Sequence, residues 1–410
     1  MIVYDLIIIG GGASGIMAAI TASQYLDKIL IIEKNNRIGK KILVTGNGRC
    51  NYTNAFLKTT DFNNPAFVEN IFNQFDPQDT IDFFETLGIE PKIEDEGKAY
   101  PLSEQSSSFL DVFLFEIKKR NIQVELNKEV IDIFKKNDVF KVVSSANEAF
   151  LGKKVIIATG GKSMPSTGSN GSGLDLAKNL GHKITEVFPA LVKLRVDSPY
   201  LKQLAGVKIN TQVDLLVGNE VVQSEYGDLL FANYGISGPT ILELSRKANE
   251  KLMKRLEVFV KIVLIQSLPK SKIIERFEMF KSREIDQSLI GLVNKRFINV
   301  LIKEAGIEKN NMVVGDIPKQ NIFKLIDLLY DWRLKVTGSL GFDDSQVTAG
   351  GIELTEIHES TLESKLIQGL YFTGEVLDVD GRCGGYNLQW AWSSGYVAAK
   401  SACEEIRKND

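Results

Sequence analysis

The chain contains few of the residues that build metal centres, histidine triads and disulfide frameworks. Its 410 residues include two histidines, His182 and His358, and three cysteines, Cys50, Cys383 and Cys403, all far apart in the sequence. No CxxC pair is present, which excludes a zinc ribbon and a thioredoxin-type redox site. Two isolated histidines do not supply a multi-histidine metal site or a catalytic triad. We therefore predict no metal site in this protein.

Long apolar runs and a strong charge of one sign are also lacking. No segment approaches the roughly 20 consecutive apolar residues that cross a bilayer. No basic residue precedes the apolar stretch that begins at Leu6, as a signal peptide would require. The net charge of −3 gives the molecule no bulk attraction for polyanions, and the low, odd cysteine count suits a reducing compartment. We expect a cytoplasmic protein with no membrane partner, and we do not expect a nucleic-acid partner.

The first motif joins an apolar strand to an alanine-rich helix through a glycine turn. In "YDLIIIGGGASGIMAAI", Gly10, Gly12 and Gly15 form the pattern GxGxxG. Gly10 permits a tight turn, Gly12 lets the backbone approach a pyrophosphate, and Gly15 lets the helix pack closely on the strand. A second strand, "KILIIEK", ends at Glu33, which can accept hydrogen bonds from both hydroxyls of an adenosine ribose. The pattern predicts a site for NAD or FAD, because Glu33 would repel the 2′-phosphate of NADP.

The segment after Glu33 favours FAD over NAD. "KNNRIGKKILVTGNGRCNYTN" is an extended polar loop that contains Gly39, Gly46 and Gly48 together with cations, hydroxyls and amides. A plain NAD-binding unit would continue directly into a short loop and a helix. A loop of this composition can return toward the nucleotide and line a longer cofactor with two phosphates. The alternative, a basic solvated loop, does not account for the glycine spacing in "TGNGRCN".

Three later segments also bear on the nucleotide site. "NIQVELNKEVIDIF" reads as two short strands, and Val130 would lie against the adenine. "KKVIIATGG" is an apolar strand that ends in Thr159 and Gly160, next to the pyrophosphate and the flavin. The glycine-rich stretch "GSNGSGLDLAKNLGH" has no strand directly before it, so we do not predict a second, independent NAD domain.

The C-terminal segment "GLYFTGEVLDVDGRCGGYNLQWAWSSG" combines a strand, a glycine-lined loop and a helix. We expect the strand to pair beside the first strand of the chain and to bring Gly374 and Glu375 to the flavin. The first turn of the helix, Gly385 to Gln389, would aim N–H groups at the pyrimidine edge of the flavin and favour its reduced, anionic form. A helix that only packs on the core would not explain the glycines before it.

The residues that we predict to bind FAD come from separate parts of the chain. They are Gly10, Gly12, Ala13, Ser14, Gly15, Glu33, Lys34, Lys41, Thr45, Gly46, Gly48, Arg49, Cys50, Asn51, Val130, Thr159, Gly160, Gly374, Glu375, Gly385, Asn387, Leu388 and Gln389. The site would therefore combine backbone N–H groups, hydroxyls, amides and cations.

The middle of the chain has a different pattern. We predict an FAD-binding domain over 1–188 and 346–410, a β-rich insert over 189–264 and 333–345, and a helical insert over 265–332. From Lys251 to Tyr330 there are 15 Lys and Arg against 9 Asp and Glu, a net charge of +6. Such cations can hold a phosphate-bearing partner or form the solvated side of amphipathic helices, and we favour solvated helices.

Six motifs, taken in order, run over most of the chain: "IIGGGASGIMAA", "GKKILVTGNGRCNYTN", "IIATGGKSMPSTGSNGSGLDLAKNLGH", "GDLLFANYGISGPTILELS", "VTAGGI" and "GLYFTGEVLDVDGRCGGYNLQWAWSSGYVAA". Together they resemble the BaiN/YhiN-type flavoprotein family, also described as aminoacetone-oxidase-like FAD-binding enzymes. The resemblance implies a place in the glutathione-reductase/fumarate-reductase-like FAD superfamily. The predicted fold is α/β, with a Rossmann-like FAD-binding domain of the glutathione-reductase type, an inserted β-barrel-like domain and a small helical domain.

We predict an FAD-dependent oxidoreductase that transfers a hydride between flavin and a small organic substrate bound between the cofactor domain and the β insert. The resemblance implies two reactions. One is reduction of an enone or another C=C bond with NADH or NADPH as a transient reductant, and the other is oxygen-dependent oxidation of a small amine. We favour the reduction. A third alternative is an RNA-associated flavoprotein that docks through its basic helices.

No catalytic acid or base is assignable from the sequence. The candidates to face the flavin ring are Tyr234, Arg382, Cys383 and Tyr386. Glu375 or Asp378 would tune the site. No second cysteine lies near Cys383 in the sequence, so we do not predict a relay between flavin and a disulfide.

Overall fold

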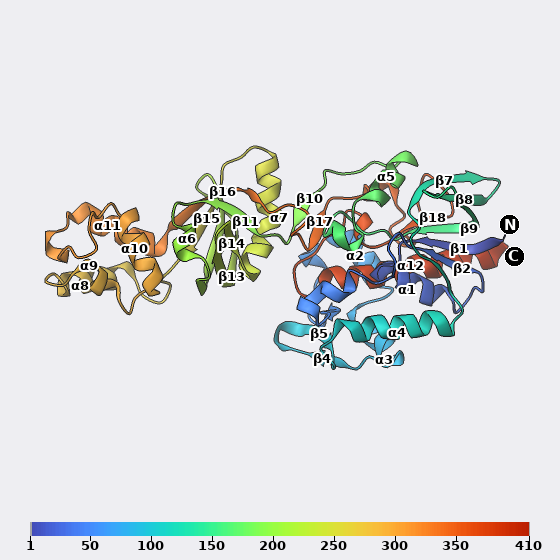
Figure 1. Cartoon of the computed structure of the whole chain (residues 1–410), viewed down its shortest axis with the longest axis horizontal. Helices are drawn as coiled ribbons and strands as arrows, with labels where there is room; N and C mark the ends of the chain where they lie inside the picture. The colour runs from blue at the N-terminus through green and yellow to red at the C-terminus, as the bar shows by residue number, and fades with distance from the viewer. Residues whose placement is uncertain (1, 410) are drawn as a thin grey trace. The chain divides into compact units, whose positions relative to one another are not determined.

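The computed structural model describes residues 2–409, which form two compact units (Figure 1). The first unit comprises Met1–Pro189 and Phe342–Asp410, and the second comprises Ala190–Gly341. The chain thus enters and leaves the second unit once, so the first unit is built from both ends of the sequence.

A seven-stranded sheet organises the first unit, in the order β6-β2-β1-β9-β8-β7, with β18 on the other side of β9. Its strands are β1 (Val3–Ile9), β2 (Ile29–Ile32), β6 (Gln123–Glu125), β7 (Val130–Lys136), β8 (Val139–Ser144), β9 (Ala149–Ile157) and β18 (Leu370–Phe372). β6, β2, β1, β9 and β18 run parallel, whereas β8 is antiparallel to both of its neighbours, β9 and β7. The mainly apolar sequences of β1 and β2 suit central strands that are covered on both faces.

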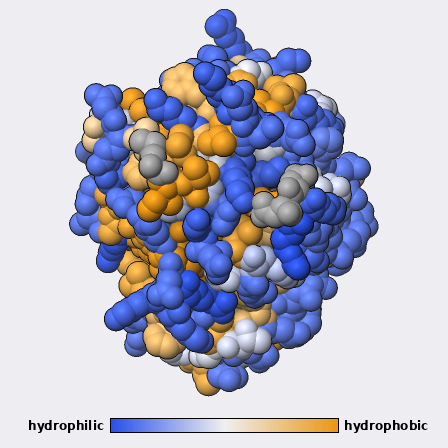
Figure 2. Space-filling model, turned by 90° about the vertical axis from the view of Figure 1, so that its right-hand side faces the viewer, coloured by the Kyte–Doolittle hydropathy of each residue, from blue (hydrophilic) through white to orange (hydrophobic). Residues whose placement is uncertain are grey.

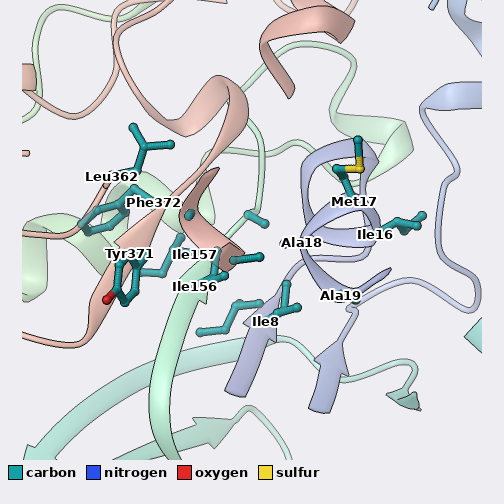
Figure 3. Close-up of a cluster of buried hydrophobic side chains, with 14 of the residues drawn as sticks. Ile8, Ile16, Met17, Ala18, Ala19, Ile156, Ile157, Leu362, Tyr371 and Phe372 are labelled. Atoms are coloured by element: carbon teal, nitrogen blue, oxygen red, sulfur yellow. The ribbon is translucent and has the colours of Figure 1, made fainter. Parts of the chain in front are cut away.

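The C-terminal strand does not pair where the sequence led us to expect it. β18 pairs with β9 in register Tyr371 to Ile156, and β9 lies between β18 and β1. The expected pairing beside the first strand is therefore wrong. Ile156, Ile157, Tyr371 and Phe372 come together in one buried cluster, which Figure 3 shows beside Ile8 and Met17.

Helices and a second small sheet complete the first unit. The helices are α1 (Ala13–Ala22), α2 (Pro65–Phe72), α3 (Pro77–Thr86), α4 (Ser106–Lys119), α5 (Ser172–Asn179) and α12 (Tyr386–Asn409). The remaining strands are β3 (Thr53–Asn54), β4 (Pro91–Ile93), β5 (Lys98–Pro101), β10 (Phe188–Ala190) and β17 (Val347–Ala349), and β3, β5 and β4 form one sheet. α12 packs on α1, and a Cβ atom at Gly395 would lie 2.4 Å from the carbonyl oxygen of Ser14. Small residues on α12 therefore bring the two ends of the chain together.

A closed barrel organises the second unit, in the order β11-β14-β13-β12-β15-β16. Its strands are β11 (Leu194–Asp197), β12 (Lys208–Val217), β13 (Glu220–Ala232), β14 (Gly235–Ser237), β15 (Val258–Val263) and β16 (Trp332–Ser339). The neighbouring strands are antiparallel. The predicted barrel-like insert in a Rossmann-type fold is confirmed.

Helices of the second unit share the core of the barrel. They are α6 (Leu201–Leu204), α7 (Pro239–Met253), α8 (Lys270–Met279), α9 (Ile285–Leu289), α10 (Lys295–Glu304) and α11 (Lys319–Tyr330). The ring of Phe297 on α10 meets that of Trp332 on β16 at 5.8 Å between centroids. Barrel and helices therefore form one hydrophobic cluster. The boundaries that we assign to separate β-rich and helical inserts remain a prediction.

Among residues 2–409, no helix combines the length and apolar character that crossing a membrane requires. The face in Figure 2 is mainly hydrophilic, with smaller hydrophobic areas between the hydrophilic ones.

Candidate cofactor and active site

One cavity of the first unit gathers many of the predicted cofactor residues. Its wall includes residues where β1, β2 and β9 end, and residues of the first turns of α1 and α12. The predicted residues in this wall are Gly10, Gly12, Ala13, Ser14, Glu33, Lys34, Lys41, Thr45, Val130, Thr159, Gly160, Gly374, Glu375, Asn387 and Leu388. Residues from both ends of the chain therefore share one cavity.

The first glycine turn packs tightly against the protein on one side and faces open space on the other. Gly10 has a φ of +105°, and a Cβ atom there would lie 2.5 Å from the carbonyl oxygen of Ala158. At Gly15 a Cβ atom would lie 2.0 Å from the carbonyl oxygen of Gly10. At Gly12 a Cβ atom would meet nothing within 4 Å, although Gly12 lines the cavity. A side chain at Gly12 would thus fill space that a ligand can use.

The charges around the cavity suit a diphosphate. Five cations lie in its wall against three carboxylates, and the first turn of α1 carries no acidic residue. The N–H groups of a first helical turn have no partner within the helix and attract anions. Burial lowers the pKa of the Lys34 ammonium, and the carboxylates of Glu129 and Glu33 oppose this effect.

Glu33 is held as a hydrogen-bond acceptor at the end of β2. Its Oε2 accepts a hydrogen bond from the backbone N–H of Gly11 at 2.8 Å. Its Oε1 accepts from the backbone and side-chain N–H groups of Asn35, both at 2.8 Å. The side chain is almost fully buried. Because Oε2 has a single donor among these contacts, it has room to accept a further hydrogen bond from a hydroxyl of a ribose.

An ion pair joins two distant parts of the cavity wall. Lys41 Nζ lies 2.9 Å from Glu375 Oε2, and both side chains are about three-quarters buried or more. Glu375 Oε1 also accepts a hydrogen bond from the backbone N–H of Thr348 at 2.6 Å. The pair therefore ties the loop after β2 to the turn after β18. Open space at Gly12, an acceptor at Glu33 and cations between them form a donor set that fits FAD.

Part of the second polar loop turns away from the cavity. Arg49 forms ion pairs with Glu94 and Glu104, both at 2.8 Å, and lies over the ring of Tyr100. The side-chain amide of Asn51 donates to the carbonyl oxygens of Thr53 and Ala99. Burial raises the pKa of the Cys50 thiol to about 12. Gly46, Gly48, Arg49, Cys50 and Asn51 lie outside the cavity wall, and this segment packs on the β3-β5-β4 sheet.

The C-terminal glycine loop is held mainly by contacts within the protein. Gly385 has a φ of +100°, and a Cβ atom there would lie 2.3 Å from the carbonyl oxygen of Thr53. The amide of Asn387 donates to the carbonyl oxygens of Gly381 and Arg382, which folds the loop over the start of α12. The buried amide of Gln389 donates to Thr80 and Ser393. Gly385 and Gln389 lie outside the cavity wall, whereas Asn387 and Leu388 line it.

Two catalytic candidates contact the cavity wall: Arg382 through its carbonyl oxygen, which accepts from Asn387, and Cys383 through its side chain. The Cys383 thiol donates to Gln346 Oε1 at 3.8 Å, and Gln346 lines the cavity. Tyr386 packs against Phe62, with 5.9 Å between ring centroids. Tyr234 belongs to the second unit, where Lys193 lies 5.9 Å above its ring.

Sequence reasoning missed several parts of the cavity wall, of which two are instructive. Gln346 and Val347 line it from the segment that contains β17; Val347 begins the motif "VTAGGI", to which we assigned no cofactor residue. Gly168, Ser169 and Ser172 line it from the stretch "GSNGSG". This stretch is glycine-rich because α5 approaches β9 closely, and a Cβ atom at Gly173 would lie 1.7 Å from Thr159 Oγ1. The glycines of this stretch were therefore the sequence feature that could have placed it beside the cavity.

Metal ligands do not cluster in this region. Within the described part of the chain, no group of three or more His, Cys, Asp or Glu side chains lies together as a set of metal ligands.

Comparisons with known proteins agree with this architecture. The family model described as the HI0933-like protein Rossmann domain matches residues 4–401. The 3-dehydro-bile acid delta(4,6)-reductase of Clostridium scindens is 36% identical over 97% of this chain and 98% of its own. The ribosomal RNA dihydrouridine synthase of Escherichia coli is 31% identical over 97% of each chain.

Among solved structures, Sdh1 of Mycobacterium smegmatis in complex with UQ1 has the same fold. It is 15% identical, with a TM-score of 0.50, over 99% of this chain and 69% of that one. The family predicted from the six motifs is confirmed, because the family model spans nearly the whole chain. The chain belongs to the HI0933-like family of Rossmann-domain proteins and is an FAD-dependent oxidoreductase.

Proposed function

We propose that this protein reduces a C=C bond conjugated to a carbonyl group. The chemistry common to two relatives with different substrates carries this proposal. The bile acid reductase, by its name, removes double bonds at positions 4 and 6 of a 3-oxo steroid. The dihydrouridine synthase, by its name, saturates the C5=C6 bond of uracil, which is conjugated to the C4 carbonyl. At the Δ4 bond of the steroid and at the C5=C6 bond of uracil, reduction adds a hydride at the β carbon and a proton at the α carbon; at the Δ6 bond the hydride enters at the δ carbon, through the conjugated system.

The cavity residues would hold FAD in an extended form. Glu33 would accept hydrogen bonds from the adenosine ribose, and Val130 would lie against the adenine. The open side of Gly12 and the N–H groups of α1 would receive the pyrophosphate. Lys41 and Glu375 would lie nearer the flavin, which supplies a hydride when bound and reduced.

The proton would come from the thiol of Cys383. Hydride addition at the β carbon moves the electron pair of the C=C bond to the carbonyl oxygen as an enolate. The S–H proton of Cys383 then adds to the α carbon, the carbonyl re-forms, and the thiolate regains a proton from water. Lys98 lies beside this loop, because its Cε is 3.2 Å from where a Cβ atom at Gly384 would be, and its Nζ forms an ion pair with Glu96 at 2.6 Å. An ammonium beside the loop would stabilise the thiolate.

NADH or NADPH would act as a transient reductant. The glycine-rich stretch that resembles a second nucleotide motif lines the same cavity as the first one. It therefore offers no separate place for a resident nicotinamide. The nicotinamide would visit first and the unsaturated substrate would follow.

An anaerobic assay separates the alternatives. Holoprotein is reduced with NADH or NADPH and is then mixed with a 3-oxo-4-ene steroid or a uridine-containing RNA transcript. We expect reoxidation of the flavin and a product heavier by two hydrogen atoms with at least one of them. Reduction of the flavin by a small amine with release of peroxide in air would instead establish the oxidase alternative and overturn the proposal.

A further inference from the structure

α10 presents a cationic face to solvent and an apolar face to the core. Phe297, Ile298, Val300, Leu301 and Ile302 are buried in the core of the second unit. Its exposed side chains are Lys295, Arg296, Asn299 and Lys303, and none of the exposed side chains described on this helix is acidic. Lys295, Asn299 and Lys303 follow at intervals of four residues, so they lie on one stripe.

The loop after α10 extends this stripe. The amide of Asn310 donates to Asn299 Oδ1, which attaches the loop to the exposed side of the helix. Lys309 and Asn311 are exposed beside Asn310. We call Lys295, Asn299, Lys303, Lys309 and Asn310 the α10 face. It combines three ammonium groups with two amides on one fixed surface.

The cations of the α10 face differ from those on α8. Lys270 and Lys272 on α8 pair with Asp327 and Glu275, both at 2.7 Å, and Lys281 after this helix pairs with Glu278. Within residues 2–408, Lys295, Lys303 and Lys309 form no ion pair. The acids nearest to them in the sequence are Glu304, which is half-buried, and Glu308, which is exposed. The α10 face therefore keeps most of its positive charge available for an external anion.

We propose that the α10 face binds the sugar–phosphate backbone of RNA. Lysines contact phosphates, and asparagine amides can bind phosphate oxygens and 2′-hydroxyls. Residues 251–330 carry +6 and the rest of the chain −9, so the charge that attracts RNA is concentrated in this part of the chain. The net charge of −3 for the whole chain does not show this separation of charge between the two regions.

An anionic membrane is the weaker partner for this surface. A helix that binds membranes inserts its apolar side chains into the lipid, whereas the apolar side chains of α10 are buried in the protein. An RNA partner also agrees with uracil as the conjugated substrate. This choice of substrate rests on the proposed function, but RNA binding by the α10 face does not need turnover.

Two variants with the same change in charge test the proposal. In one, Lys295→Gln, Lys303→Gln and Lys309→Gln are combined on the α10 face. In the matched control, Lys270→Gln, Lys272→Gln and Lys281→Gln are combined at the ion-paired sites. Binding of a fluorescent, uridine-containing RNA hairpin to each holoprotein is measured by anisotropy over a range of salt. We expect the α10 variant to bind about ten-fold or more weakly at low salt, and its slope of log K against log salt to fall by roughly two. The control should bind within about two-fold of wild type.

The outcomes distinguish this proposal from the reaction itself. An equal loss in both variants, or no binding of the hairpin by wild type at low salt, overturns the RNA surface. Binding to phosphatidylserine vesicles but not to RNA overturns it in favour of a membrane. Reduction of a 3-oxo-4-ene steroid should be unchanged in both variants, which also shows that they fold. Suppose that the wild-type protein reduces neither substrate, and that of the two variants only the α10 variant binds RNA more weakly. The proposed reaction would then be wrong, whereas RNA binding by the α10 face would be supported.

Discussion

Two glycine loops of this protein look alike in sequence and differ in what they approach. The first, Gly10 to Gly15, has open space at Gly12, where the backbone borders the cavity. The second, Gly381 to Gly385, meets its own chain, because Gly385 lies against the carbonyl group of Thr53. Gly12 in the first loop therefore borders open space of the cavity, whereas Gly385 in the second loop lies against the backbone of the protein. The same substitution should therefore have different effects in the two loops.

The largest expected effect is a loss of stability from Gly385→Val. The side chain would enter a left-handed backbone conformation and clash with the Thr53 carbonyl, at a cost of about 3 kcal/mol or more in the free energy of unfolding. Chemical denaturation of the holoprotein measures it. Gly384→Val is the matched control, because its φ is +107° but the nearest atom to its Cβ would be Cε of the flexible Lys98 side chain, at 3.2 Å. If Gly385→Val keeps wild-type stability and lowers the flavin potential, the loop acts on the cofactor as we first expected.

Gly12→Val should separate cofactor binding from folding. Gly12 has a φ of −82°, which valine also adopts, and its side chain would project into open space. We expect FAD to bind at least about a hundred-fold more weakly, a change of about 2.8 kcal/mol, while the stability of the FAD-free protein stays near wild type. Titration with FAD and thermal unfolding measure the two quantities. Gly12→Ala should lie between valine and glycine in affinity, and full FAD retention by the valine variant would contradict the position that we propose for the pyrophosphate.

Cys383 tests whether the second loop contributes a side chain to the reaction. We expect Cys383→Ala to lower turnover about a hundred-fold, because a positioned proton donor is lost. The FAD content and the rate of flavin reduction by NADPH should stay unchanged, since these steps precede proton transfer to the substrate. Cys383→Ser keeps an exchangeable proton and should restore part of the rate. Slower flavin reduction in the alanine variant would show that Cys383 affects the cofactor rather than the substrate.

The ion pair between Lys41 and Glu375 should have the smallest effect. It joins the loop after β2 to the turn after β18 in a partly solvated position, so we expect a coupling of about 1 kcal/mol, or roughly five-fold in FAD affinity. A double-mutant cycle with Lys41→Met and Glu375→Gln measures it. Additive effects of the two substitutions would show that the pair does not stabilise the FAD-bound wall.

Local patterns in the sequence were sufficient for the family, the Rossmann-type unit, the barrel and the first glycine turn. In each of these, the strand, the turn and the helix follow one another directly, so their periodicity and glycine spacing can be read within a short window. The motif around Gly10 also places Glu33 correctly at the end of the next strand. The same reasoning named Thr159 and Gly374, which line the cavity with Gly10.

Only the tertiary structure decided which distant segments meet. β18 pairs with β9, Gln346 joins the cavity wall, Gly385 packs on Thr53, and Asn310 attaches a loop to α10. None of these contacts can be predicted from a short stretch of sequence, because each joins residues from separate segments of the chain. From a glycine one can infer that another group lies close to the backbone, and from a lysine that a positive charge is present. Whether the neighbour is a ligand, another strand or an acidic side chain depends on how the chain packs.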